Sequence, residues 1–219
     1  MIPKIIHYIW LGGKELPALE QKCIETWAKF NPDYKIMRWD ETNLTIDDEE
    51  YRKAYHKKQW AYCADLARMK VLYEHGGIYL DTDMEIIKPF DDLLTHEFFI
   101  GKEDDEMISG GIIGATINNT FVLEIYNEVK KSLKTNFIPI PRIITYIYRK
   151  NASAKSITVF DKDYFYPFNP YSSNIKQLLY CDITKNTYAI HHWSKSWDIS
   201  FVRKVYRRLK RIALRSKYY

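Results

Sequence analysis

The sequence predicts an α/β protein in which helices flank a mixed, mostly parallel β-sheet. Short runs rich in β-branched and aromatic residues alternate with longer segments of helical periodicity, which favours a sheet covered by helices. The 219 residues are 46% hydrophobic and 28% charged, a globular mixture that excludes disordered, collagen-like and disulfide-scaffold proteins. Repeats, low-complexity stretches and linkers are absent before the tail. We therefore expect one domain over residues 1–200 and a separate tail over 201–219.

The first half of the chain alternates regularly between the two kinds of element. Lys4–Leu11 is an apolar, β-branched run that stops at a Gly-Gly pair and therefore predicts a strand. Helical spacing of apolar residues predicts a helix over Pro17–Phe30, which the following Asn-Pro pair ends. A second strand is expected over Tyr34–Trp39. Polar and acidic residues then predict a loop with the beginning of a helix over Asp40–Glu50.

A long helix and a strand follow. Lys57–His75 has helical periodicity and is closed by Gly76-Gly77, where a left-handed cap is favoured. Ile78–Asp83 predicts a strand that breaks into Asp-Thr-Asp. The remaining expected elements are strands at Glu97–Gly101, Met107–Ala115, Ile157–Phe160 and Tyr188–Trp193, and helices at Thr120–Leu133 and Pro141–Lys150.

Membrane-spanning and disulfide-bonded classes are not expected. The sequence has no run of about 18 apolar residues, and its start lacks the basic region, apolar run and cleavage site of a signal peptide. Cys23, Cys63 and Cys181 are far apart and odd in number, which indicates a reduced cytosolic chain without a structural zinc site.

Asp81 and Asp83 form a DXD motif at the end of a predicted strand. Residues two apart on a strand share a face, so both carboxylates would point into the crevice beyond the carboxyl end of the strand. Two such carboxylates suit Mn²⁺ or Mg²⁺ with open positions for a diphosphate. The alternative is a solvated turn, in which Asp is common.

Asp65 and Arg68 lie three residues apart on the preceding helix. They share its apolar side, whereas Lys70 and Glu74 lie roughly opposite, so we expect the first pair to point inward. An inward pair would be either a salt bridge between helix and sheet or a functional pair, with Asp65 on sugar hydroxyls and Arg68 facing a donor.

Several segments together resemble glycosyltransferase family 32, the DXD-containing group of bacterial capsule and lipopolysaccharide sugar transferases and fungal mannosyltransferases. They are IPKIIHYIWLGG at the N-terminus, Trp27 before Asn-Pro-Asp-Tyr, ADLARMKVLYEHGGIYLDTDMEIIKPF at 64–90 and AIHHWSKSW at 189–197. The similarity covers about the first 95 residues and this last segment, and residues 103–188 match loosely. The resemblance implies a GT-A-type fold, a nucleotide-sugar donor, a divalent metal and retention of anomeric configuration.

The resemblance also implies roles for single residues. Trp10 would stack on the nucleotide base, although core packing is the alternative. Asp65 and Arg68 would hold the donor sugar and its phosphate side, and Tyr79 would contact the diphosphate. Asp81 would lie near the ribose and the metal.

Asp83 would then be a direct metal ligand, and His191 a third contact to metal or phosphate. His192 is the alternative, because adjacent strand residues point to opposite faces and one of the two fits. Without the resemblance, both histidines would be ordinary strand residues.

Ser109-Gly110-Gly111 is a further candidate for the donor-sugar site. Glycines within a strand indicate either close approach of another group or a β-bulge without a ligand. Ser109 would hydrogen-bond a sugar hydroxyl, and Gly110 would line the site. No carboxylate nucleophile is evident, because the acidic run Glu103–Asp105 is typical of solvated surface. The resemblance implies a front-face mechanism in which the departing phosphate takes the acceptor proton.

The tail carries the excess positive charge. Residues 201–219 hold eight Lys or Arg and no acid, so with a total of +5 the rest of the chain carries −3. Apolar residues at helical spacing predict a basic amphipathic helix that binds an anionic membrane surface. A helix docked on the domain is the alternative, and no nucleic-acid partner is expected because the body is acidic.

Together these features predict a metal-dependent, retaining hexosyltransferase. It would move a hexose from a nucleotide sugar, with a UDP-sugar favoured, to a growing surface glycan such as capsule or lipopolysaccharide, free or lipid-linked. We expect it in the cytoplasm, peripheral on the inner face of the cell membrane. The alternatives are a haloacid-dehalogenase-like phosphohydrolase, disfavoured by Met84-Glu85 after the DXD, and a membrane- or nucleic-acid-binding protein with a non-catalytic metal site.

Overall fold

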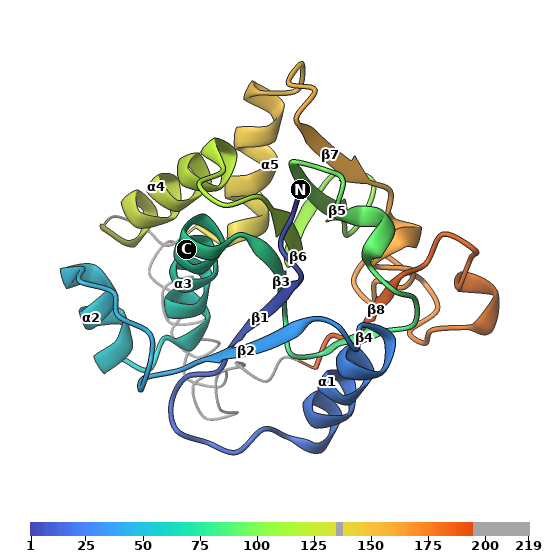
Figure 1. Ribbon diagram of the computed structural model, residues 1–219, viewed down its shortest axis with the longest axis horizontal. Coiled ribbons are helices and arrows are strands. Elements are labelled where there is room, and N and C mark those ends of the chain that lie inside the picture. Colours follow the sequence, from blue (N-terminus) through green and yellow to red (C-terminus); the bar gives the residue numbers. More distant parts are fainter. Residues whose placement is uncertain (135–137, 195–219) are drawn as a thin grey trace, which may run out of the picture.

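The computed structural model describes residues 1–134 and 138–194, which fold around a six-stranded sheet of order β2-β1-β3-β6-β5-β7 (Figure 1). Strand β6 runs antiparallel to β3 and β5, whereas the other neighbours are parallel. The mixed, mostly parallel sheet is therefore as predicted. Its strands are β1 (Ile5–Ile9), β2 (Lys35–Trp39), β3 (Gly77–Leu80), β5 (Phe98–Lys102), β6 (Ile108–Ala115) and β7 (Ile157–Phe160).

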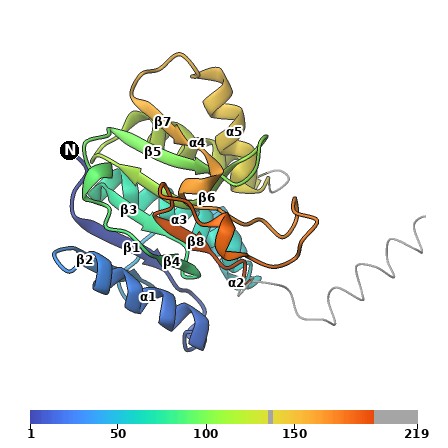
Figure 2. The same ribbon diagram turned by 90° about the vertical axis from the view of Figure 1, so that its right-hand side faces the viewer.

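Helices cover both faces of this sheet (Figures 1 and 2). On one side lie α3, α4 and α5. On the other side lie α1 and a small antiparallel sheet of β4 and β8. The bounds are α1 (Ala18–Phe30), α2 (Glu49–His56), α3 (Trp60–His75), α4 (Thr120–Lys134), α5 (Ile140–Lys150), β4 (Met84–Ile86) and β8 (Ala189–His191).

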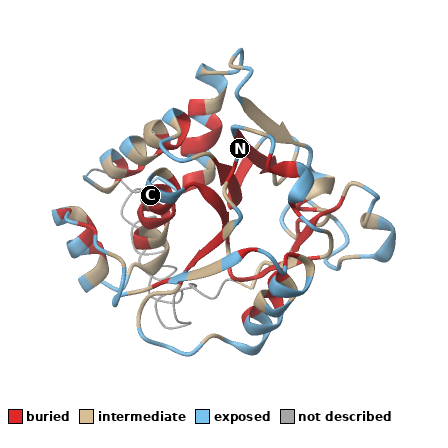
Figure 3. Cartoon of the chain, viewed as in Figure 1, coloured by how far each residue is buried: buried red, intermediate tan, exposed pale blue. Residues whose placement is uncertain are grey.

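The central strands are buried on both faces, as the red strands of Figure 3 show. Alternate residues of one strand belong to different cores: Phe98 and Ile100 pack with α3, α4 and α5, and Phe99 packs on the side of α1. Burial on two faces explains why these strands are continuous apolar runs in the sequence and do not alternate with polar residues.

The helix predicted over 57–75 is wrong at its start, because α3 begins at Trp60 and a separate helix, α2, ends at His56 just before the predicted range. The first, α2, begins earlier, where Asp48 Oδ1 accepts the backbone N–H of Tyr51 at 3.0 Å and caps the helix. Lys58 then has a φ of 54°, a left-handed conformation that ends the helical path. The second helix, α3, starts at Trp60.

The glycine pair between α3 and β3 behaves as predicted. Gly76 and Gly77 have φ values of 61° and 97°. A Cβ on Gly77 would lie 2.6 Å from the backbone oxygen of Ile5 and 2.9 Å from His7 Nε2. Glycine is therefore required both for the backbone conformation and for the close approach of this turn to β1.

The topology places several loop residues along one edge of the sheet. Because β6 alone is reversed among these six strands, the carboxyl ends of β1, β3 and β5 lie at the same edge. Trp10, Asp81 and Glu103 directly follow these three strands. Ligands of open α/β sheets bind at such an edge.

The structure bears on membrane association in one respect and leaves the predicted basic helix outside its described residues. None of the helices in residues 1–134 and 138–194 is long and apolar enough to span a bilayer. The predicted basic helix over 201–219 lies outside the described residues.

Candidate active site

The DXD motif lies in a turn between β3 and β4. Strand β3 ends at Leu80, earlier than predicted, and the backbone N–H of Met84 donates to Asp81 O at 3.1 Å to close the turn. Trp27 Nε1 on α1 donates to Met84 O at 2.6 Å and fixes the end of the turn that leads into β4. The two carboxylates therefore converge because the chain turns, and not because they share a strand face.

Asp81, Asp83 and His191 form a cluster in which one ligand atom from each residue lies within 4.8 Å of the others. Strand β8 pairs with β4 so that His191 lies opposite Met84, one residue from the DXD turn. His192 points elsewhere and bonds Glu85 Oε2 at 2.8 Å. Of the two candidate histidines, His191 is the one placed with the aspartates.

This cluster fits a divalent ion. Ligand atoms bound to one ion at about 2.1 Å lie within about 4.2 Å of one another, so small side-chain rotations would let the three groups share an ion. His191 Nε2 lies 3.2 Å from Asp83 Oδ1, and its Nδ1 is buried without a hydrogen-bond partner in the described part of the chain. Carboxylate oxygens and an imidazole nitrogen suit Mn²⁺ or Mg²⁺.

Asp83 is buried and held at both carboxylate oxygens. Oδ1 contacts His191, and Oδ2 accepts the backbone N–H of Ser194 at 2.8 Å. Burial disfavours the carboxylate, but these hydrogen bonds and the charge of His191 outweigh it and lower the pKa of Asp83 to about 2. The pKa of His191 is raised, because the bond to Asp83 outweighs its own burial. Asp83 is thus ionised and oriented for a cation.

Asp65 and Arg68 point inward from α3, as predicted. The Arg68 guanidinium is 3.0 Å from Asp65 Oδ1 and 3.2 Å from Asp81 Oδ1, and it donates to Gly110 O at 2.7 Å. Its Cζ lies 4.6 Å from the centre of the Tyr79 ring. Burial raises the pKa of Asp65, and Arg68 opposes that rise. Arg68 therefore joins the helix to the DXD turn.

Tyr79 donates its hydroxyl to the same oxygen, Asp81 Oδ1, at 2.8 Å. Asp81 is consequently positioned by both Arg68 and Tyr79, and the other oxygen, Oδ2, faces Gly111. The roles of these residues toward a donor remain predictions, since a salt bridge between helix and sheet has the same geometry.

The Ser-Gly-Gly segment brings β6 against this cluster. Pairing between β5 and β6 is irregular between Ile100 and Lys102, as the bulge interpretation expects. A Cβ on Gly111 would lie 3.2 Å from Asp81 Oδ2, and one on Gly110 would lie 3.3 Å from Arg68 Nη1. The two interpretations of this segment therefore both hold: Arg68 and Asp81 approach its glycines closely, and its pairing with β5 contains a bulge.

Tyr166 is a residue that the sequence analysis missed, and Glu103, expected at the solvated surface, is half-buried. Tyr166 is buried, its hydroxyl accepts the N–H of Ile112 at 3.0 Å, and its ring meets that of His191 edge-on at 5.6 Å. The Ser109 side chain lies beside both Glu103 and Tyr166, where it opposes the rise that burial causes in the pKa of each. Burial raises the pKa of Glu103. Solvent exposure was thus the wrong expectation for this residue.

Asp105, in the same acidic run, is exposed and pairs with Lys162 at 2.8 Å, as expected of solvated surface. The signal that distinguishes Glu103 is its position directly after β5, at the sheet edge that carries Asp81.

Trp10 lies at that edge, directly after β1. Its ring is half-buried beside the core on the side of α1, and its indole N–H donates to Lys14 O at 2.7 Å. Stacking on a base remains a prediction for this residue.

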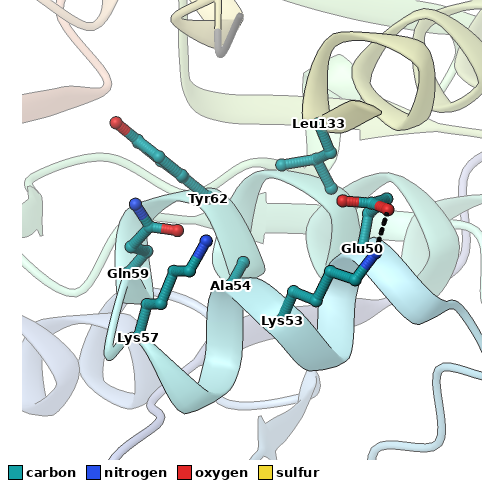
Figure 4. A pocket seen from close by; sticks show the side chains of 7 residues that line it. All are labelled: Glu50, Lys53, Ala54, Lys57, Gln59, Tyr62 and Leu133. Carbon is teal, nitrogen blue, oxygen red and sulfur yellow. Dashed lines mark hydrogen bonds and ion pairs between the residues drawn. The ribbon is translucent and has the colours of Figure 1, made fainter. Parts of the chain in front are cut away.

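A separate hollow of about 190 Å³ lies among α2, the start of α3 and the end of α4 (Figure 4). Its lining holds no residue of the DXD cluster, and its Lys53 already pairs with Glu50 at 2.8 Å. We therefore assign the site from the ion-binding cluster. The lining residues are Glu50, Lys53, Ala54, Lys57, Gln59, Tyr62 and Leu133.

Comparisons with known proteins identify related glycosyltransferases. Residues 17–100 match the family described as "Glycosyltransferase sugar-binding region containing DXD motif". An uncharacterized glycosyltransferase of Acanthamoeba polyphaga mimivirus is 32% identical over 190 residues, 78% of this chain and 76% of that protein. Inositol phosphoceramide mannosyltransferase 3 of Schizosaccharomyces pombe is 27% identical over 139 residues, 59% of this chain and 38% of that protein. The chain thus spans less than half the length of this fungal relative.

Solved structures share the fold at low identity. The PaToxG glycosyltransferase superposes with a TM-score of 0.60 at 18% identity, covering 69% of this chain and 70% of that one. The galactosyltransferase LgtC, solved with donor and acceptor sugar analogs, has a TM-score of 0.54 at 13% identity and 88% coverage of both chains. These likenesses confirm the expected GT-A-type fold.

Proposed function

Because this chain belongs to glycosyltransferase family 32, the DXD-containing glycosyltransferases, we propose that it moves a hexose from a nucleotide sugar to a growing surface glycan. The reaction is metal-dependent and retains the anomeric configuration, and a UDP-sugar is the favoured donor. The observation that carries this proposal is the convergence of Asp81, Asp83 and His191 at the ligand-binding edge of the sheet.

These three residues would hold Mn²⁺ or Mg²⁺. When bound, the ion supplies Lewis-acid stabilisation of the negative charge that develops on the leaving diphosphate. Asp83 stays ionised because His191 and the N–H of Ser194 hold its carboxylate. Arg68 and Tyr79 fix the orientation of Asp81, so the site needs little rearrangement when the donor binds.

The donor sugar would lie between the DXD turn and β6. Asp65, Ser109 and Gly110 would contact its hydroxyls, and Trp10 would stack on the base. Glu103, which lies beside Ser109 and near enough to His191 for its charge to raise the pKa of that residue, would place a carboxyl group next to the DXD cluster. A carboxylate there would stabilise the positive charge that develops on the sugar ring during transfer.

The acceptor is a glycan, such as capsule or lipopolysaccharide, or a lipid-linked glycan. The fungal relatives are named as mannosyltransferases acting on inositol phosphoceramide, which makes mannose a hexose to test beside galactose and glucose. We also propose that residues 201–219 bind an anionic membrane, which places the enzyme on the inner face of the cell membrane. Deleting this tail should weaken cosedimentation with anionic vesicles, and unchanged cosedimentation would assign the tail a structural role.

Release of free nucleotide tests the reaction. The full-length protein is incubated with UDP-glucose, UDP-galactose and GDP-mannose, each with Mn²⁺ or with EDTA. We expect metal-dependent release from one donor, and loss of that release in Asp83→Asn. Failure to release or to bind any nucleotide sugar would contradict the proposal, and equal release in EDTA would contradict its metal dependence.

A further inference from the structure

A loop beside the candidate active site exposes large apolar side chains. Tyr171, Ile175, Leu179 and Tyr180 are 60%, 56%, 37% and 91% exposed. They lie within ten consecutive residues. The other exposed large hydrophobic residues of the described part are spread over the chain, at Met1, Leu19, Ile117, Ile138 and Tyr146. We call residues 170–181 the apolar loop.

The apolar loop also differs from the rest of the chain in charge. Residues 164–181 contain no Asp or Glu and one Lys, although residues 1–200 carry a net charge of −3. That lysine, Lys176, donates to the backbone oxygens of Pro170 and Ser173, both at 2.6 Å. The loop therefore presents apolar and aromatic groups without a negative charge to repel an anionic surface.

The base of the loop is built into the site. Asn169 Oδ1 accepts the N–H of Tyr171 at 2.9 Å, and its Nδ2 donates to the backbone oxygen of Glu103 at 3.1 Å. Trp193 Nε1 donates to Phe168 O at 2.8 Å. These bonds give the loop a defined position beside Glu103 and the DXD cluster.

Ring contacts lead from the loop to the ligand cluster. The ring of Tyr171 meets that of Trp193 edge-on at 5.6 Å, and the Trp193 ring centre lies 4.2 Å from that of His191. Ser194 is anchored to Asp83 and, through its hydroxyl, to Glu20 at 2.7 Å. In the sequence, the basic segment 201–219 begins seven residues after Ser194.

We propose that the apolar loop is a membrane-contact element that enters the interfacial layer of an anionic bilayer and turns the active site toward it. Tyrosine and aliphatic side chains partition into that layer, and basic residues nearby are attracted to anionic lipid. An apolar contact joined to a basic segment supplies the two signals that stable surface binding requires. The inference rests on the proposed membrane association of the enzyme, but not on the transfer reaction.

The cysteines provide a direct test of loop insertion in the full-length protein. Cys181 is exposed at the end of the loop, whereas Cys23 and Cys63 are buried. An environment-sensitive NBD label on Cys181 should shift to the blue when phosphatidylcholine vesicles with added phosphatidylglycerol are supplied, and nitroxide-labelled lipid should quench it. If the protein cosediments with the vesicles but the NBD emission does not change, the proposal is overturned. That result would instead indicate that the loop contacts a protein or a soluble glycan.

A matched pair of variants separates the loop from the tail. The double variant Ile175→Ser, Tyr180→Ser is compared with Ile117→Ser, Tyr146→Ser, which removes the same side-chain types at exposed positions outside the apolar loop. At high salt, where screening weakens the contribution of the tail, the loop variant should partition about tenfold less into vesicles, and the control should be unchanged. Equal partitioning of the two variants would refute the inference. Nucleotide release without vesicles is measured in parallel and reports separately on the proposed reaction.

Discussion

Replacing Arg68 by Met should destabilise the protein strongly, because it leaves a buried carboxylate without its cation. The side chains of Arg68 and Asp65 are each 8% exposed, whereas that of Asp81 is 30% exposed and stays partly solvated. Breaking a buried pair costs about 3–5 kcal/mol, and the lost bond to Gly110 O adds about 1 kcal/mol. We therefore expect Arg68→Met to lower the free energy of unfolding by about 4–6 kcal/mol.

Urea unfolding followed by far-UV circular dichroism measures this loss. For a chain of this length a loss of this size corresponds to a fall in Tm of about 15 °C in a thermal melt. Lys22→Met is the matched control, because it breaks a pair with Glu25 whose side chains are 76% and 62% exposed. Exposed pairs contribute less than about 1 kcal/mol, so the control should unfold almost as the wild type does.

A second variant separates stability from activity. Adding Asp65→Asn to Arg68→Met removes the unpaired charge and should recover most of the lost stability. Nucleotide release should stay low in this double variant, because Asp81 has lost the guanidinium that orients it. Arg68→Met within about 1 kcal/mol of the wild type would refute the burial argument. Recovery of both stability and release would show that the pair is structural alone.

Three further predictions concern single residues. Asp83→Asn should abolish metal-dependent nucleotide release with an unchanged circular dichroism spectrum, and release near the wild-type rate would remove the DXD turn from the mechanism. Glu103→Gln should lower kcat of transfer by about tenfold or more while its exposed neighbour variant Asp105→Asn is unaffected, and equal rates would return Glu103 to a packing role. Burial lowers the pKa of His7 to about 4, whereas in the unfolded chain it titrates near 6.5. The unfolded state therefore takes up the extra proton as pH falls, and the free energy of unfolding measured in urea should fall by about 3 kcal/mol between pH 7 and pH 4. His7→Gln should remove this fall. The same pH dependence in the wild type and in His7→Gln would contradict the reasoning.

The type and the ends of helices and strands could be predicted where residues close in the sequence determine them. The run ending at Leu80 reads as a buried strand because both of its faces pack against cores. Gly76 and Gly77 mark the end of α3 because other residues rarely adopt their positive φ. The end of β3 was misplaced because a distant residue, Trp27, fixes the turn at Met84.

The choice between the two histidines lay beyond local sequence. Both fall within the strand predicted over Tyr188–Trp193, and alternation states only that they face opposite sides. In the structure β8 ends at His191, and His192 follows it. The register of β8 on β4 places His191 opposite Met84, and that register joins residues 107 apart in the chain. Such pairing is set by tertiary packing, which local spacing does not contain.

The reversed strand β6 explains how the loosely matching middle of the chain still contributes to the site. Because β6 runs opposite to β3, its beginning lies at the edge where β3 and β5 end. Gly110 therefore comes beside Arg68 and Gly111 beside Asp81. Glu103, directly after the end of β5, lies beside Ser109 of the same segment. A strand in the parallel direction would have placed its last residues there instead. The contribution of this region thus depends on the direction of β6 and on the small size of its glycines.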